Sequence, residues 1–187
     1  VGNMYRQLRA LPDGDRINVI ITADHGMVEI SPVRFIDWDD YLKPEWCERI
    51  VATNPTNIFV KEKQYADSVM TALTGVEHIS VWKHGEVPEE LNYGTSNRCG
   101  DIIVAPDLGW QFASSPKNKV GAHGYSPKEK DMQVIFIASG PSFRRSNPST
   151  ESAAFKNTDI YPMLSDILGI QAANTDGTLQ NTALIRR

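Results

Sequence analysis

Asp24, His25 and Gly26 stand directly after an apolar, β-branched run, residues 17–22. Carboxylate oxygen and imidazole nitrogen are both good ligands for Zn²⁺. Neighbouring residues on a regular strand point to opposite faces, but where a strand ends both side chains can turn toward one ion. Gly26 has no Cβ that would crowd such a bend. The stretch therefore predicts a metal site at the end of a strand.

A second histidine, His123, has small neighbours of the same kind. It lies between Gly121 and Gly124 and precedes another apolar run, 133–138. Small neighbours allow the backbone to come close to a metal ion or a phosphate. Taken alone, an Asp-His pair also suits a helix N-cap beside a surface imidazole, and a histidine among glycines also suits an ordinary loop. The joint position beside two core-type strands favours metal ligation by His123 and the Asp-His pair.

The elements around these residues predict an α/β fold. Both apolar runs are typical of strands that are buried on both faces, as in parallel sheets. In open α/β sheets, ligands bind beyond the carboxyl ends of the strands, where the Asp-His pair stands. The spacing of apolar side chains predicts helices at 3–11 and 158–168, the second ending at Gly169. We therefore expect a partial, mostly parallel sheet flanked by helices, with a small α+β insertion.

The insertion is inferred from a change of pattern between the two apolar runs. We assign residues 1–30 and 115–187 to an incomplete core and residues 31–114 to the insertion. Residues 28–55 read as irregular, and the tail after residue 170 reads as loosely held. Within the insertion the pattern predicts strands at 57–61, 78–83, 101–105 and 110–112 and a helix at 62–73.

Composition narrows the function classes. The formal net charge is −4, hydrophobic residues make up 41% and charged residues 22%. The sequence has no excess of positive charge that would attract nucleic acid, so we expect no nucleic acid specificity. No apolar run reaches the length of a membrane span. Cys47 and Cys99 are too few for a disulfide framework, and we expect free thiols.

Five stretches, in order along the chain, carry a family resemblance: NVIITADHGM, GAHGYSP, QVIFIASGPSF, FKNTDIYPMLSDILGI and DGT. As an ordered set they resemble the C-terminal half of the type I phosphodiesterase/nucleotide pyrophosphatase family, within the alkaline phosphatase superfamily. The resemblance implies a metal-dependent hydrolase of phosphodiester or nucleotide pyrophosphate bonds, acting on a small-molecule substrate. It also implies two Zn²⁺ ions, with Asp24 and His25 on the ion that activates the nucleophile and His123 on the other.

In that family the nucleophile and the remaining ligands precede the Asp-His pair. They are a Thr or Ser at a helix start, an Asp after the first strand and an Asp-x-x-x-His group, and none matches within residues 1–23. We therefore expect a C-terminal fragment with no catalytic residue of its own and no useful hydrolase activity by itself. Its unpaired sheet edge favours self-association. The resemblance implies a periplasmic or extracellular protein.

Two alternatives stay open at this point. The same scaffold carries other chemistry in the superfamily, such as that of phosphonoacetate hydrolase, sulfatase or phosphoglycerate mutase relatives. The chain could also be a non-catalytic piece, a binding module or a truncation product. His78 and His84 lie at the ends of one predicted strand without a partner at ligand spacing, and we interpret both as structural or surface residues.

Overall fold

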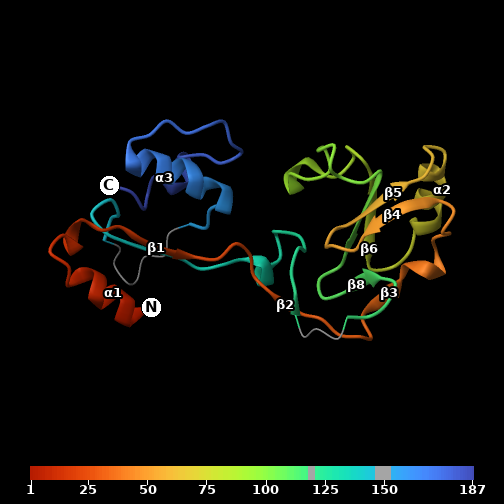
Figure 1. Cartoon of the computed structure of the whole chain (residues 1–187), viewed down its shortest axis with the longest axis horizontal. Helices are drawn as coiled ribbons and strands as arrows, with labels where there is room; N and C mark the ends of the chain where they lie inside the picture. The colour runs from red at the N-terminus through yellow and green to blue at the C-terminus, as the bar shows by residue number, and fades with distance from the viewer. Residues whose placement is uncertain (118–120, 146–152) are drawn as a thin grey trace. The chain divides into compact units, whose positions relative to one another are not determined.

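The structure is a computed structural model that describes residues 1–117, 121–145 and 153–187 (Figure 1). The chain divides into two compact units. Unit 1 consists of Val1–Asp24 and Ile135–Arg187, and unit 2 consists of His25–Val134. The contacts thus group residues 25–30 and 115–134 with the segment assigned to the insertion, whereas the sequence pattern grouped them with the core. That unit 2 is an insertion into the core of unit 1 stays a prediction.

The two apolar runs form one pair of strands in unit 1. β1 (Val19–Thr22) pairs with β10 (Phe136–Ser139) in antiparallel register, Val19 opposite Ser139 and Thr22 opposite Phe136. The expected parallel direction is therefore wrong for this pair, because an apolar run reports burial and not the direction of the neighbouring strand. Burial on both faces is also wrong here: Ile137 is 51% exposed, since no described residue covers that face of β10.

Two helices accompany this pair of strands. α1 (Gly2–Arg9) is tied to β10 by a hydrogen bond of 2.8 Å between the hydroxyls of Tyr5 and Ser139. α3 (Ile160–Leu168) places Met163 in a fully buried position. It ends at Gly169, whose φ of +66° is the left-handed conformation that glycine adopts most readily. Both helices lie where the spacing of apolar residues predicts them.

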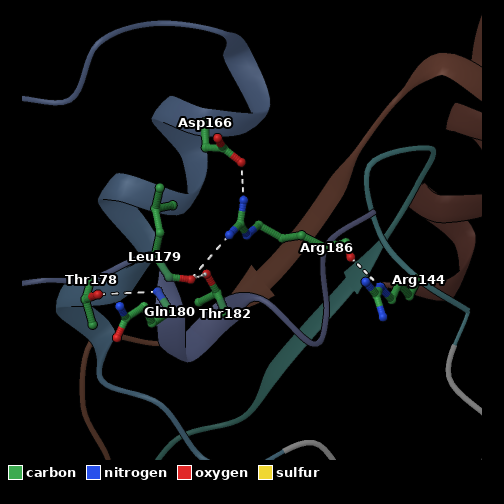
Figure 2. Close-up of polar contacts among 7 residues, drawn as sticks. All are labelled: Arg144, Asp166, Thr178, Leu179, Gln180, Thr182 and Arg186. Atoms are coloured by element: carbon green, nitrogen blue, oxygen red, sulfur yellow. Dashed lines mark hydrogen bonds and ion pairs between the residues drawn. The ribbon is translucent and has the colours of Figure 1, made fainter.

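The segment after α3 is held by side chains of that helix region, so the expected loose tail is wrong. Asp159, 1% exposed, accepts hydrogen bonds from the backbone N–H of Thr178 at 2.8 Å and from Asn181 Nδ2 at 2.9 Å. Figure 2 shows the second tie: the Arg186 guanidinium pairs with Asp166 and donates to the Leu179 carbonyl at 3.3 Å. A polar sequence therefore packs in place through long-range polar contacts.

Unit 2 is built on an antiparallel sheet in the strand order β4-β5-β7-β6. α2 (Tyr65–Leu73) packs against one face of it (Figure 1), where Val69 and Leu73 are buried with the inward residues of the strands. Alternation along the strands sends every second side chain to this core. The strands are β4 (Cys47–Val51), β5 (Thr56–Val60), β6 (Ile79–Lys83) and β7 (Ile102–Pro106).

Two short pairs complete unit 2. β2 (Val28–Glu29) pairs antiparallel with β9 (Gly121–Ala122), and β3 (Phe35–Asp37) pairs parallel with β8 (Gln111–Ala113). β2, β3 and β4 all lie in the stretch of residues 28–55 that was expected to be irregular, so that expectation is wrong. Short 3₁₀ helices span Gly14–Arg16, Trp38–Asp40, Glu89–Leu91, Lys130–Met132, Asn157–Asp159 and Gln180–Thr182.

Two sequence expectations concern the whole described chain. Cys47 and Cys99 are free thiols, as expected. Among the residues that the structure describes, no helix is both long and apolar enough to cross a membrane.

Candidate metal centre

Unit 2 brings His25 and His123 together although they lie far apart in the sequence. Their rings are stacked, with centroids 3.7 Å apart and an angle of 14° between the ring planes. The antiparallel β2–β9 ribbon explains the contact. Val28 pairs with Ala122, His25 precedes β2 and His123 follows β9, so both histidines stand at the same end of the ribbon. His25 is half-buried and His123 is exposed. The local strand pairing therefore places two imidazoles side by side, one of them in reach of solvent.

A hydrogen bond orients the ring of His25. Its Nδ1 lies 2.8 Å from the carbonyl oxygen of Gly26. A carbonyl can only accept, so Nδ1 carries a proton and donates this bond. Metal-ligating histidines commonly donate one ring N–H to a backbone carbonyl, which orients the ring. The contact of His25 with the Gly26 carbonyl is of this kind.

Gly26 is required for a reason other than the bend that the sequence suggested. A Cβ at this position would lie 1.9 Å from the carbonyl oxygen of Asp131. The backbone N–H of Gly26 also donates to the carbonyl of Met132 at 3.1 Å. Close approach of the 131–132 backbone, not a sharp turn, therefore selects glycine next to His25.

The loop that carries His123 is anchored on both sides of the histidine. Asn54 Nδ2 donates to the His123 carbonyl at 3.2 Å. Gly124 has a φ of +89°, and a Cβ there would lie 2.1 Å from the Asn54 carbonyl oxygen. Tyr125 is buried and donates its hydroxyl to the Trp110 carbonyl at 2.8 Å. Burial raises the pKa of Tyr125, so the phenol stays a donor. These contacts position the backbone of His123.

Asp24, the third predicted ligand, ends the first segment of unit 1 and is exposed. Asn157 holds the backbone here: its Nδ2 donates to the carbonyls of Ala23 at 3.1 Å and Asp24 at 2.7 Å. Sequence reasoning did not single out Asn157, because its partners lie more than a hundred residues away. Its only signal is a polar amide immediately before the predicted helix.

The arrangement offers donors of the kind that zinc takes. Two imidazoles lie together, and Asp24 adds a carboxylate directly beside His25 in the sequence. Within the described ranges, no group of three or more His, Cys, Asp or Glu side chains is arranged to hold a metal ion. Of the other histidines, His78 stacks on Trp110 and His84 Nδ1 lies 3.3 Å from the Gly100 carbonyl. Both fill structural roles in unit 2.

Comparisons with known proteins all point to one protein family. A sequence model of the family described as "Type I phosphodiesterase / nucleotide pyrophosphatase" matches residues 1–126. Human ectonucleotide pyrophosphatase/phosphodiesterase family member 5 is 35% identical over 184 residues, which is 97% of this chain and 38% of that protein. The bis(5'-adenosyl)-triphosphatase enpp4 of Xenopus laevis is 30% identical over 97% of this chain and 40% of its own length.

Solved structures agree with the sequence comparisons. Human ectonucleotide pyrophosphatase/phosphodiesterase 5 superimposes with a TM-score of 0.87 at 31% identity, covering all of this chain and 50% of that one. An inactive variant of the murine protein in complex with AMP gives the same TM-score and identity, over 98% of this chain and 49% of its own. The chain thus spans about half or less of each relative. The likeness confirms the predicted alkaline phosphatase-like α/β fold class.

Proposed function

Because this chain belongs to the type I phosphodiesterase/nucleotide pyrophosphatase family, we propose that the whole protein hydrolyses phosphodiester or nucleotide pyrophosphate bonds. We propose further that this chain supplies ligands for two zinc ions, Asp24 and His25 for one and His123 for the other. The observation that carries the proposal is the contact of His25 with His123, with ring centroids 3.7 Å apart.

The geometry of the histidines is compatible with one imidazole on each of two ions. In two-metal sites that transfer phosphoryl groups, the ions lie about 3.5–4 Å apart. Two nearly parallel rings at a separation of 3.7 Å match that spacing, with one imidazole for each ion. The hydrogen bond of 2.8 Å between His25 Nδ1 and the Gly26 carbonyl orients the ring, as is common for metal-ligating histidines.

Zinc in such a site lowers the pKa of a bound hydroxyl and offsets the charge that develops on phosphate oxygens. The residues of this chain hold and orient the site. Gly26 and Gly124 permit the close backbone approaches that set the two histidines, and Asn157 fixes the backbone before His25 through the carbonyls of Ala23 and Asp24. In the proposal the nucleophile comes from outside this chain, and the chain alone therefore does not turn over substrate.

Nucleotides are the proposed substrate class. The relatives are named as nucleotide pyrophosphatases, as phosphodiesterases or as a triphosphatase of a dinucleoside, and one structure holds AMP. A phosphodiester bears one negative charge on oxygens that two zinc ions would contact, which suits a pair of adjacent metal positions. The phosphonoacetate hydrolase alternative keeps the metals and differs in the bond that breaks.

Zinc titration by calorimetry, with metal content measured after dialysis, tests the ligand assignment. Asp24→Ala, His25→Ala and His123→Ala are each expected to lower zinc affinity at least tenfold, because even loss of a group that only orients a ligand costs about 10- to 100-fold. His84→Ala is the matched control, since it removes an imidazole placed elsewhere in unit 2. Equal zinc binding by the triple variant and the unaltered chain would refute the assignment.

Hydrolysis of a nitrophenyl phosphodiester, compared with phosphonoacetate, tests the chemistry. The whole protein is expected to cleave the phosphodiester and to lose at least 99% of this activity when His25 and His123 are both replaced by Ala. This chain alone is expected to release no nitrophenol above the uncatalysed rate. Turnover by this chain that disappears with His25→Ala would show that it carries its own nucleophile.

A further inference from the structure

The sheet of unit 2 has a second face, opposite α2, that the metal centre does not use. Ile102 and Val104 belong to the core beneath α2, so Ile103 and Ala105 of the same strand point to the opposite face. On β6 the same alternation separates Val81, packed against the core, from Trp82. The second face is therefore apolar and carries a tryptophan.

Two loops cover part of this face and leave a cavity of about 470 Å³ between them and the sheet. The volume falls within the range of about 300–1,000 Å³ that is usual for small-molecule sites. The loop of residues 85–100 contributes Val87, Leu91 and Tyr93, and the segment after His123 contributes Tyr125 and its neighbours. Gly94 shows how closely the first loop packs, because a Cβ there would lie 2.5 Å from a methyl group of Val87.

The two tyrosines that line the cavity have their hydroxyls in hydrogen bonds to other residues, so they offer a ligand mainly their apolar rings. The Tyr93 hydroxyl accepts a hydrogen bond of 2.9 Å from Asn57 Nδ2. The Tyr125 hydroxyl donates to the Trp110 carbonyl at 2.8 Å. Together with Trp82, these tyrosines give the lining three aromatic side chains. Aromatic faces attract cations, and tryptophan does so most strongly.

The charges of the lining also favour a positively charged ligand. The lining residues Glu90, Asp107, Glu129 and Lys128 carry three negative charges against one positive. Lys128 Nζ pairs with Glu90 at 3.2 Å, and Asp107 pairs with His78 at 3.1 Å. Glu129 is half-buried, and among the described residues no hydrogen bond or ion pair engages its carboxylate. An anion entering this cavity would meet no unpaired cation.

We propose that the cavity between the second sheet face of unit 2 and the loops of residues 85–100 and 124–129 binds a small organic ammonium ion with an apolar body. Trp82, Tyr93 and Tyr125 receive the apolar body and the adjacent positive charge, and Glu129 pairs with the ammonium group. The proposal goes beyond phosphoester hydrolysis, because none of the lining residues is a proposed zinc ligand.

Binding of 2-phenylethylammonium to the whole chain, measured by calorimetry, tests the charge and shape of the site. The neutral isostere 2-phenylethanol and the anion 3-phenylpropionate are the comparison ligands. The ammonium ion is expected to bind at least tenfold more tightly than either. Equal or tighter binding of the anion, or no measurable binding of the ammonium ion at 10 mM (roughly −2.7 kcal/mol), would overturn the proposal.

Two substitutions with opposite expected effects separate electrostatics from damage to the fold. Glu129→Gln should weaken ammonium binding about tenfold and leave phenylethanol binding unchanged. Lys128→Gln should strengthen ammonium binding two- to fivefold, because it releases the Glu90 carboxylate beside the cavity. Glu89→Gln is the matched control, an exposed carboxylate next to Glu90 that does not line the cavity. If Glu129→Gln and Glu89→Gln change the affinity equally, the proposed contact is wrong.

Discussion

Asp159→Asn should destabilise unit 1 by about 2–4 kcal/mol. The carboxylate is 1% exposed and accepts three hydrogen bonds: Oδ1 from the Thr178 N–H at 2.8 Å, and Oδ2 from the Lys156 N–H at 3.0 Å and Asn181 Nδ2 at 2.9 Å. An amide has one acceptor oxygen, so in either orientation its NH₂ group faces at least one of these donors. One lost bond to a charged acceptor costs about 1.5–3 kcal/mol, and the stranded donor adds to this.

The pH dependence of the loss has a defined sign. Burial alone would raise the pKa of Asp159, but the hydrogen bonds from Thr178, Asn181 and Lys156 outweigh it and hold the pKa below its ordinary value. A lowered pKa in the folded state means that the carboxylate contributes stability above its unfolded pKa, about 3.9. That stability is lost as the pH falls through the lower, folded pKa. The unaltered chain and the variant should therefore converge in stability in strong acid.

Hydrogen exchange read by mass spectrometry is the suitable assay, because it reports the two units separately. Amides of α3 and of residues 178–182 should exchange about 30- to 1,000-fold faster in the variant at neutral pH, since each 1.4 kcal/mol is a factor of ten. Asp176→Asn, an exposed acid on the same segment, should change exchange less than threefold. Unchanged protection of α3 in Asp159→Asn, or a loss that persists undiminished in strong acid, would refute the reasoning.

Other contacts carry three further predictions. Gly124→Ala should destabilise unit 2 by about 2–4 kcal/mol, because it strains a residue with φ of +89° and places a Cβ 2.1 Å from the Asn54 carbonyl. Urea unfolding followed by tryptophan fluorescence measures this loss, since all four tryptophans lie in unit 2. Arg186→Met should free the tail from Asp166 and raise exchange of residues 179–187 at least fivefold, by the same mass spectrometry. The chain should self-associate, and Ile137→Lys, at a side chain 51% exposed on β10, should shift sedimentation toward the monomer.

Each of these has a control or a contradicting result. Gly75→Ala is the control for Gly124, because Gly75 also has a positive φ, +82°, but a Cβ added there would meet no atom within 4 Å. For Arg186→Met, exchange that rises equally in unit 2 would point to general destabilisation instead of release of the tail. A sedimentation profile that is monomeric at high concentration before any substitution would contradict self-association.

Elements with a strong local signal were predicted from the sequence. α2 and α3 follow from apolar residues at helical spacing, and Gly169 marks the end of α3. β4 was missed because the register shifts between Cys47 and Arg49, which breaks the two-residue alternation that identifies a strand. The antiparallel pairing of β1 with β10 was missed because direction is not encoded in an apolar run.

Long-range polar contacts account for the rest of what the sequence did not predict. Asp159 and Asp166 lie at the predicted helix of residues 158–168, and nothing in the local pattern indicates their partners, which lie around Thr178 and at Arg186. For the metal centre, the sequence predicted His25 and His123 as ligands from residue type and position beside strands, but it did not predict the stacking of their rings. The cavity near Glu129 was not predicted either, because segments far apart in the sequence build it.

The discontinuity of unit 1 has a consequence for synthesis on the ribosome. β1 leaves the ribosome early, but its partner β10 follows only after the whole of unit 2, residues 25–134, has been made. At about 5–20 residues per second, β1 waits roughly 5–20 s for β10. During that interval unit 2, a continuous segment, can fold first. The edge of β1 that pairs with β10 therefore lacks this partner until synthesis has passed residue 139.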